Sequence, residues 1–350
     1  MPAATLRLSA ALFVTSLASF LGCSEAPATT HNSAQPDAQT FSDAGLNDAS
    51  SSPPDADLSP LAAELKADLN YRTASGKTLA ADLYLPARTN PVPVVLVIHG
   101  GGFANGDKAG KSEEVYAKHL QANGLAAFSI NYRVYEDFPS GTSAYPGALH
   151  DVKCSIMWIR KHASEYRVDK NHVFVLGGSA GGYFTNMVGT SGNDPSFDPT
   201  DCTDGAGESS AVQGAVTYFG PSDWNALFTD PQRLAPNDAG VPQNGEKKFI
   251  GLSTACTNPS DISGICTTAS PTAHADSKDP PFFISHSDDD PVVPVSQGRL
   301  MKETLASKNV SVTYVEVHGK AHGWHARFDD AEIAAVRDQV TAWIKDLSAK

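Results

Sequence analysis

Hydrophobic and polar positions form two alternating patterns along the chain from about residue 65 onward. A short, unbroken apolar run is typical of a strand buried on both faces of a parallel sheet, and one occurs at 94–98. Runs rich in apolar residues predict further strands at 125–133, 172–176, 215–219, 281–286 and 310–317. Between them lie longer segments with apolar residues three to four positions apart, which predict helices at 112–123, 148–166, 295–308 and 329–347. Strands that alternate with helices predict one doubly wound, mostly parallel sheet.

Two parts of the chain depart from this alternation. Residues 69–72 and 79–85 flank the turn signal Ser75-Gly76 and have the pattern of an antiparallel hairpin. Residues 224–278 are rich in Pro, Asn, Gly, Thr and Ser. We interpret this segment as an insertion over one end of the sheet, part loop and part short helix.

The first residues have the pattern of an export signal. Arg7 is the only charged side chain before an apolar run that ends at Leu21, and the run is too short for a good membrane span. Gly22-Cys23 resembles a bacterial lipoprotein processing site, in which Cys23 becomes the lipidated first residue. Phe20 and Leu21 depart from the usual residues of that site, so cleavage followed by ordinary secretion stays open.

The chain therefore divides into three predicted parts. Residues 1–23 are the signal peptide with its lipoprotein cysteine. Residues 24–62, mostly Ala, Ser, Thr, Asp and Pro, bury too little apolar surface to fold and form a disordered linker. Residues 63–350 form the folded domain, with 224–278 as its insertion.

The charge composition limits the classes of molecule that this chain is expected to bind. The formal net charge of −13 argues against nucleic acid or an anionic membrane surface as the main partner. Part of the acidity is local, in the linker and in residues 288–290, so it is not evidence for a cationic substrate.

Cysteine usage fits an oxidising compartment. Without Cys23, an even number remains, which suggests two disulfides in an exported chain. Cys256 and Cys266 lie in one loop-like stretch and are expected to pair, which leaves Cys154 with Cys202. Other pairings and free thiols stay open. Zinc is less favoured because no CxxC or histidine spacing accompanies these residues.

Four chemically distinctive segments follow predicted strands. They are His99-Gly100-Gly101-Gly102, the turn Gly177-Gly178-Ser179-Ala180-Gly181-Gly182, the acidic run Asp288-Asp289-Asp290, and His318 to Trp324. Because the carboxyl ends of parallel strands meet at one edge of a sheet, we expect these segments to lie together. A Ser at a strand–turn–helix apex, followed along the chain by an Asp and a His, is the order of a hydrolytic triad.

These segments resemble a known family. Together with Asn131-Tyr132-Arg133, Tyr145-Pro146, a D-x-x-V-P segment and an A-H-G-W segment, they are similar to the α/β-hydrolase serine esterases. Within these, the resemblance is to the branch of bacterial feruloyl esterase-type (BD-FAE-like) domains and relatives of hormone-sensitive lipase. It covers about residues 65–347 and implies an α/β-hydrolase fold. The insertion carries no matching pattern.

The resemblance implies a nucleophile and a base. Ser179 matches the nucleophile, which needs a neighbouring base because a neutral hydroxyl attacks poorly. His322 precedes Gly323-Trp324, as the family's H-G-aromatic pattern requires, and is the expected base. His318 and His325 are the alternatives.

The remaining parts of the site follow in the same way. Asp290, directly before a P-V-V-P run, is the expected acid, and its two acidic neighbours are interpreted as solvated turn residues rather than as part of a metal-binding cluster. The N–H groups of Gly101, Gly102 and Ala180 are expected to stabilise the oxyanion. His99 is interpreted as a residue that holds the glycine loop.

The expected function is that of a serine carboxylic ester hydrolase that needs no cofactor or metal. It would act outside the cytoplasm on small or polysaccharide-linked esters, either as an outer-membrane or cell-surface lipoprotein or as a secreted or periplasmic protein. An amidase or peptidase of the same fold is the alternative among hydrolases, and a non-catalytic binding module is the alternative outside them. Aromatic residues considered for the substrate pocket are Phe103, Trp224, Phe228 and Trp324.

Overall fold

The computed structural model describes residues 61–234, 245–252, 256, 260 and 264–350. The predicted signal peptide, Cys23 and all but the last two residues of the predicted linker lie outside these residues. Within the described ranges, no helix is long and apolar enough to cross a membrane.

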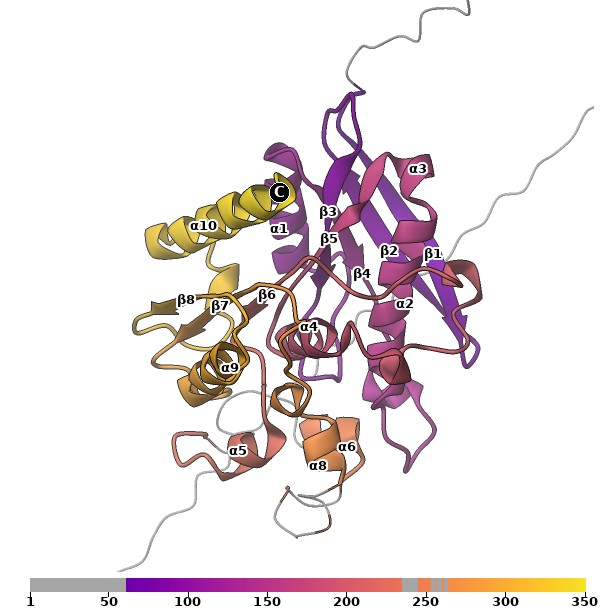
Figure 1. The fold of residues 1–350 in the computed structure, drawn as a ribbon. Coiled ribbons are helices and arrows are strands. Elements are labelled where there is room, and N and C mark those ends of the chain that lie inside the picture. Colours follow the sequence, from indigo (N-terminus) through magenta and orange to yellow (C-terminus); the bar gives the residue numbers. More distant parts are fainter. Residues whose placement is uncertain (1–60, 235–244, 253–255, 257–259, 261–263) are drawn as a thin grey trace, which may run out of the picture. The chain divides into compact units, whose positions relative to one another are not determined.

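The described residues form one eight-stranded sheet in the order β1-β2-β4-β3-β5-β6-β7-β8 (Figure 1). The strands are β1 (Glu64–Ala74), β2 (Lys77–Leu85), β3 (Val92–Ile98), β4 (Ala126–Ile130), β5 (Val168–Gly178), β6 (Gly214–Tyr218), β7 (Phe282–Ser287) and β8 (Val312–Val317). The β1–β2 and β2–β4 pairs are antiparallel, and every other pair is parallel. The predicted mostly parallel sheet with an N-terminal hairpin is confirmed.

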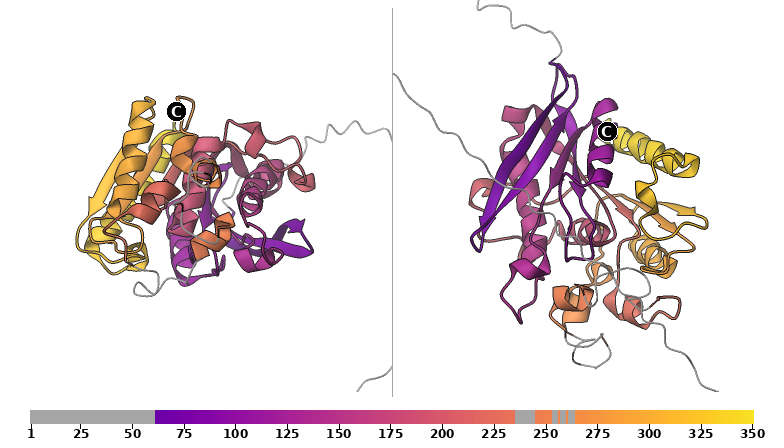
Figure 2. Two further views of the ribbon diagram at one scale, coloured as in Figure 1. Left: turned by 90° about the horizontal axis from the view of Figure 1, so that it is seen from below. Right: turned by 180° about the vertical axis from the view of Figure 1, so that it is seen from behind.

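Helices cover both faces of the sheet (Figure 2). The helices α1 (Lys111–Ala122) and α10 (Ala331–Ser348) pack on one face, and α2 (Gly147–Lys161), α4 (Ala180–Ser191) and α9 (Val295–Ser307) pack on the other. The strand β3 shows why its apolar run is unbroken: Val94 and Leu96 belong to the core under α2 and α4, whereas Val95 and Val97 belong to the core under α1 and α10. Successive side chains of a strand point to opposite faces, so both must be apolar here.

Two elements are shorter than the sequence pattern predicts. The strand β4 ends at Ile130, and the next residues form a loop because the Asn131 side chain accepts a hydrogen bond from the Lys108 N–H (2.6 Å) and donates one to Asp107 (3.1 Å). The predicted helix 148–166 is interrupted at His162, after which the short helix α3 (Ala163–Tyr166) ends at a residue with left-handed backbone. Both differences come from local hydrogen bonding and backbone conformation that apolar spacing does not report.

The described part of residues 224–278 contains short helices and loop residues. The helical segments are α5 (Trp224–Thr229), α6 (Gly245–Ile250), α8 (Ile265–Thr268) and the 3-10 turn η4 (Pro271–Ala273). Phe249 of α6 stacks on Phe103 with ring centroids 4.2 Å apart, and Tyr183 and Trp224 pack against the same rings. An aromatic cluster therefore joins the insertion to the loop that follows β3.

Candidate functional site

Ser179 stands at the turn between β5 and α4, with φ 57° and ψ −121°. A positive φ is uncommon for a residue with a side chain and stores strain unless its surroundings hold it in place. The neighbouring glycines explain how the turn is held. A Cβ on Gly177 would lie 2.5 Å from the backbone of Gly181, and a Cβ on Gly181 would lie 2.1 Å from the Ile98 carbonyl oxygen. The strand, the helix and β3 approach so closely that only glycine fits.

Three of the residues singled out in the sequence form one hydrogen-bonded line. The His322 Nε2 lies 2.8 Å from the Ser179 Oγ, and the His322 Nδ1 lies 2.7 Å from the Asp290 Oδ2. The Asp290 carboxylate is buried, whereas His322 and Ser179 are partly exposed. The residues come from the ends of β5, β7 and β8, as the strand-end argument requires.

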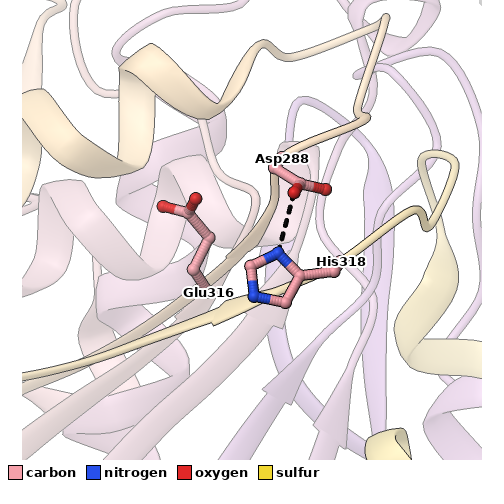
Figure 3. A group of neighbouring side chains, drawn as sticks. All are labelled: Asp288, Glu316 and His318. Atoms are coloured by element: carbon pink, nitrogen blue, oxygen red, sulfur yellow. Dashed lines mark hydrogen bonds and ion pairs between the residues drawn. The ribbon is translucent and has the colours of Figure 1, made fainter.

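The alternative histidine, His318, lies elsewhere and pairs with a different acid. Its Nδ1 is 2.7 Å from the Asp288 Oδ2 (Figure 3). This hydrogen bond is the main reason why the pKa of Asp288 is lowered and the pKa of His318 is raised. Both side chains are exposed, so the pair is a surface contact that does not include Ser179.

Asp288, His318 and Glu316 have ligand atoms within 4.8 Å of one another, which is close enough to surround a cation. The Glu316 carboxylate, however, already accepts hydrogen bonds from two guanidinium nitrogens of Arg299, at 2.6 and 3.1 Å, and from the Tyr314 hydroxyl at 2.9 Å. We therefore interpret this group as an ion-pair network at the surface.

The glycine loop lies beside the serine turn. A Cβ on Gly100 would be 3.5 Å from the Ser179 Cβ. Gly101 and Gly102 have φ of 113° and 60°, and a Cβ on Gly101 would lie 2.1 Å from the Asn105 carbonyl oxygen. Ala180 is the first residue of α4, where a backbone N–H has no acceptor inside the helix. The glycine loop and the first turn of α4 thus both adjoin Ser179.

His99 contacts this loop and helps to hold it in place. Its ring stacks on Tyr132 at 4.2 Å between centroids, and its Nδ1 lies 2.8 Å from the Gly100 carbonyl oxygen. The Tyr132 hydroxyl donates to the His99 carbonyl oxygen at 2.9 Å. Burial lowers the pKa of His99 to about 4, so the imidazole is neutral. These contacts agree with the interpretation of His99 as a loop-holding residue.

A cavity of about 590 Å³ contains the Ser179 and His322 side chains and the glycine loop. Sequence reasoning missed several residues of its wall: Glu113, Phe219 and Phe328. None of them belongs to a recognisable motif, although Glu113, as an acidic residue among the apolar positions of a predicted helix, carried a weak signal. His325 also lines the cavity, beside Gly178, where a Cβ would lie 3.0 Å from its Nε2.

The aromatic residues considered for the pocket are not in this wall. Phe103, Trp224 and Trp324 are at most 2% exposed and belong to the core, and Phe228 packs on Trp224. Among the described residues of the insertion, none lines the cavity that contains Ser179. Lys248, Gly251 and Leu252 instead line a second cavity of about 580 Å³ with residues 135–136 and 138–142.

The four cysteines of the folded part lie in the two predicted pairs. Cys154 and Cys202 have their sulfurs 2.13 Å apart, and Cys256 and Cys266 have theirs 2.04 Å apart. The first pair joins α2 to the loop before β6, and the second joins two parts of the insertion.

Comparison with known proteins identifies the family. The BD-FAE family model matches residues 81–305, more than half of the chain. The chain belongs to the BD-FAE family. This match confirms the resemblance stated from the sequence, and the strand order is that of the α/β-hydrolase fold.

Curated relatives of this BD-FAE chain include two proteins of Mycobacterium tuberculosis. The probable carboxylic ester hydrolase LipM is 30% identical over 238 residues, which are 67% of this chain and 50% of LipM. Esterase LipC is 30% identical over 237 residues, which are 67% of this chain and 54% of LipC. The match thus spans about half the length of each relative.

Solved structures show the same fold. A truncated form of a carbohydrate esterase from gut microbiota superposes with a TM-score of 0.66 over 84% of this chain and 99% of its own length, at 22% identity. At that identity the likeness bears on the fold alone.

Proposed function

We propose that this chain is a serine carboxylic ester hydrolase in which Ser179, His322 and Asp290 act as the catalytic triad. The observation that carries the proposal is the hydrogen-bonded line from the Ser179 Oγ through both ring nitrogens of His322 to the buried Asp290 carboxylate. The esterase names of the M. tuberculosis relatives support the same reaction class.

The geometry suggests the order of events. His322 Nε2 takes the proton of Ser179 as its oxygen attacks the ester carbonyl, and the imidazolium is stabilised by Asp290. The negative oxygen that forms accepts hydrogen bonds from the backbone N–H groups of Ala180, Gly101 and Gly102. The alcohol leaves with the proton from His322. Water, activated by the same imidazole, then cleaves the acyl-enzyme.

The strained backbone of Ser179 fits this role. A serine with φ 57° at a strand–helix turn projects its hydroxyl away from both elements and places the next N–H beside it. A binding module would have no need of this strain together with a paired imidazole, so the geometry favours catalysis over the non-catalytic alternative.

The test compares the purified protein with Ser179→Ala on short-chain, long-chain and hydroxycinnamoyl aryl esters and on a peptide anilide. We expect ester turnover by the wild type and a loss of at least about 1,000-fold in kcat for the variant. Ser307→Ala, at the exposed end of α9, is the matched control and should retain full activity. Equal turnover by wild type and Ser179→Ala contradicts the mechanism, and faster anilide than ester cleavage favours the amidase alternative.

We also propose that residues 63–350 are a single catalytic domain that is exported and held at a membrane surface through a lipid on Cys23. The two predicted disulfides, Cys154–Cys202 and Cys256–Cys266, support an oxidising compartment. Detergent-phase partitioning of the full chain, compared with Cys23→Ala, tests the anchor. If both proteins stay in the aqueous phase, the lipid anchor is excluded and ordinary secretion remains.

We propose small or polysaccharide-linked esters as the substrates.

A further inference from the structure

Glu113 is a buried carboxyl in the wall of the cavity that contains Ser179. It is the third residue of α1, and only 8% of its surface is exposed. The Ser112 hydroxyl donates to its Oε2 at 2.7 Å. No cationic side chain among the described residues lies within 4.0 Å of this carboxyl. A buried carboxyl is normally paired with a cation, so its position at a substrate cavity calls for an explanation.

The surrounding backbone leaves room for this carboxyl. Gly110 also lines the cavity, and a Cβ there would lie 2.3 Å from the Glu113 Oε2. Any other residue at position 110 would push the carboxyl out of its place. Burial, with a smaller contribution from Asp107, raises the pKa of Glu113. The ionised form of this carboxyl is therefore less favoured here than it would be in water.

The other charges in the wall do not cancel that of Glu113. Asp107 and Lys111 both line the cavity, but both are exposed, so solvent screens them more strongly than it screens a buried group. The pKa values of His99 and His325 are lowered by burial to about 4, so neither ring is cationic at neutral pH. The fixed charge that an ester meets in this wall is therefore negative whenever Glu113 is ionised.

We propose that Glu113 makes the cavity select esters by charge, favouring those that carry an ammonium group over those that carry a carboxylate. The inference rests on the proposed hydrolysis at Ser179 and adds a substrate class to it. An ammonium group supplies the cation that the carboxyl lacks, whereas a substrate carboxylate meets a like charge in a partly desolvated site. Neutral esters are expected to lie between the two.

The experiment uses two series of esters at pH 8, where ionisation of Glu113 is favoured, because either the acyl or the alcohol part could face this wall. The acyl series consists of 4-nitrophenyl pentanoate, 4-aminobutyrate and the glutarate half-ester, which end in methyl, ammonium and carboxylate after the same three methylenes. The alcohol series compares butyrylthiocholine with its uncharged isostere 3,3-dimethylbutyl thiobutyrate. Spontaneous hydrolysis is subtracted, and kcat/KM is measured for each ester.

In at least one series, we expect the kcat/KM of the wild type to be roughly ten-fold or more higher for the ammonium ester than for the uncharged ester. One close charge pair can produce a difference of this size. Glu113→Gln should reduce that ratio to near one. Glu114→Gln is the matched control: it removes the same charge from the next residue, whose carboxylate is 44% exposed and bonded to Lys118 at 2.6 Å, and it should keep the wild-type ratio.

Two outcomes overturn the inference: a wild-type ratio near one in both series, or an unchanged ratio in folded Glu113→Gln. The wild-type ratio needs no variant, so the inference stays testable if Glu113→Gln does not fold. Failure of the proposed function looks different, because the wild type would then not hydrolyse the neutral pentanoate and thiobutyrate esters either.

Discussion

Asp290 contacts His322 through one carboxylate oxygen while the backbone fixes the other. Its Oδ2 lies 2.7 Å from the His322 Nδ1, and its Oδ1 accepts the N–H groups of Val292 and Val293 at 2.9 and 3.0 Å. A carboxylate held at both oxygens cannot rotate away from the imidazole. It requires the proton of neutral His322 to be on Nδ1, so that Nε2 is free to accept the proton of Ser179, 2.8 Å away.

Replacing Asp290 with Asn tests this relationship. An amide carries no charge to stabilise the imidazolium and can donate to Nδ1, which favours the wrong tautomer. We expect kcat on a short-chain aryl ester to fall by roughly 1,000- to 10,000-fold. Asp289→Asn changes the exposed neighbour and should keep wild-type activity. A fall of less than about ten-fold for Asp290→Asn would contradict the proposed role of this carboxyl.

The two histidines near the end of β8 should differ sharply in effect. His322→Ala removes the proposed base, and a loss of at least about 1,000-fold in kcat/KM is expected. His318→Ala removes only an exposed partner of Asp288, so the loss should stay below about three-fold. Measuring both on the same ester separates the two Asp–His pairs. Similar losses for both variants would contradict the proposal that His322 is the catalytic base.

The positions of the proposed catalytic residues could be predicted because each depends on a short, local pattern. A glycine-rich turn after an apolar run and an acidic or histidine-bearing segment at a strand end can be recognised in the sequence alone. The order of parallel strands then brings them to one edge of the sheet. The strand β3, with apolar residues on both faces, is recognised for the same local reason.

The cavity wall could not be predicted in this way. Glu113 reaches it from the first turn of α1 and Phe219 from the end of β6, and both depend on how distant segments pack. Trp324, considered for the substrate pocket, lies in the core. It is close to His322 in the sequence, yet it is fully buried against Tyr218 and Phe219. Proximity in sequence to a catalytic residue says little about which way a side chain on a loop points.

Buried histidines should make the fold sensitive to acid. Burial lowers the pKa values of His99 and His286 from 6.5 to about 4, and the two are 2% and 0% exposed. Below pH 6.5 the unfolded chain takes up protons at these residues, whereas the folded protein does not until the pH nears 4. The free energy of unfolding should therefore fall as the pH drops from 6.5 to 4, by roughly 3 kcal/mol for each histidine.

Urea unfolding followed by circular dichroism between pH 7 and pH 4 measures this slope. The variant His286→Gln removes one titrating group while an amide keeps a donor for the Val293 carbonyl oxygen, which accepts from the imidazole at 2.7 Å. We expect the slope to become shallower for this variant and to stay unchanged for Ser307→Ala, which removes no titrating group. A slope for His286→Gln equal to that of the wild type would contradict the linkage.

The close approach at Gly181 should be needed for both stability and catalysis. In Gly181→Ala the new Cβ would lie 2.1 Å from the Ile98 carbonyl oxygen and 2.8 Å from that of His99. Both are backbone atoms, at the end of β3 and the start of the glycine loop, so β3 and α4 must separate. We expect a loss of about 3 kcal/mol or more in the free energy of unfolding and a fall in kcat, because the loop's N–H donors move away from Ser179.

Gly319→Ala is the control for this prediction. With φ 64° and no atom within 4 Å of its Cβ, this variant adds backbone strain of about 1 kcal/mol without a clash. If urea unfolding shows equal losses for the two variants, and kcat of Gly181→Ala is unchanged, close packing between β3 and the serine turn is not what positions the loop.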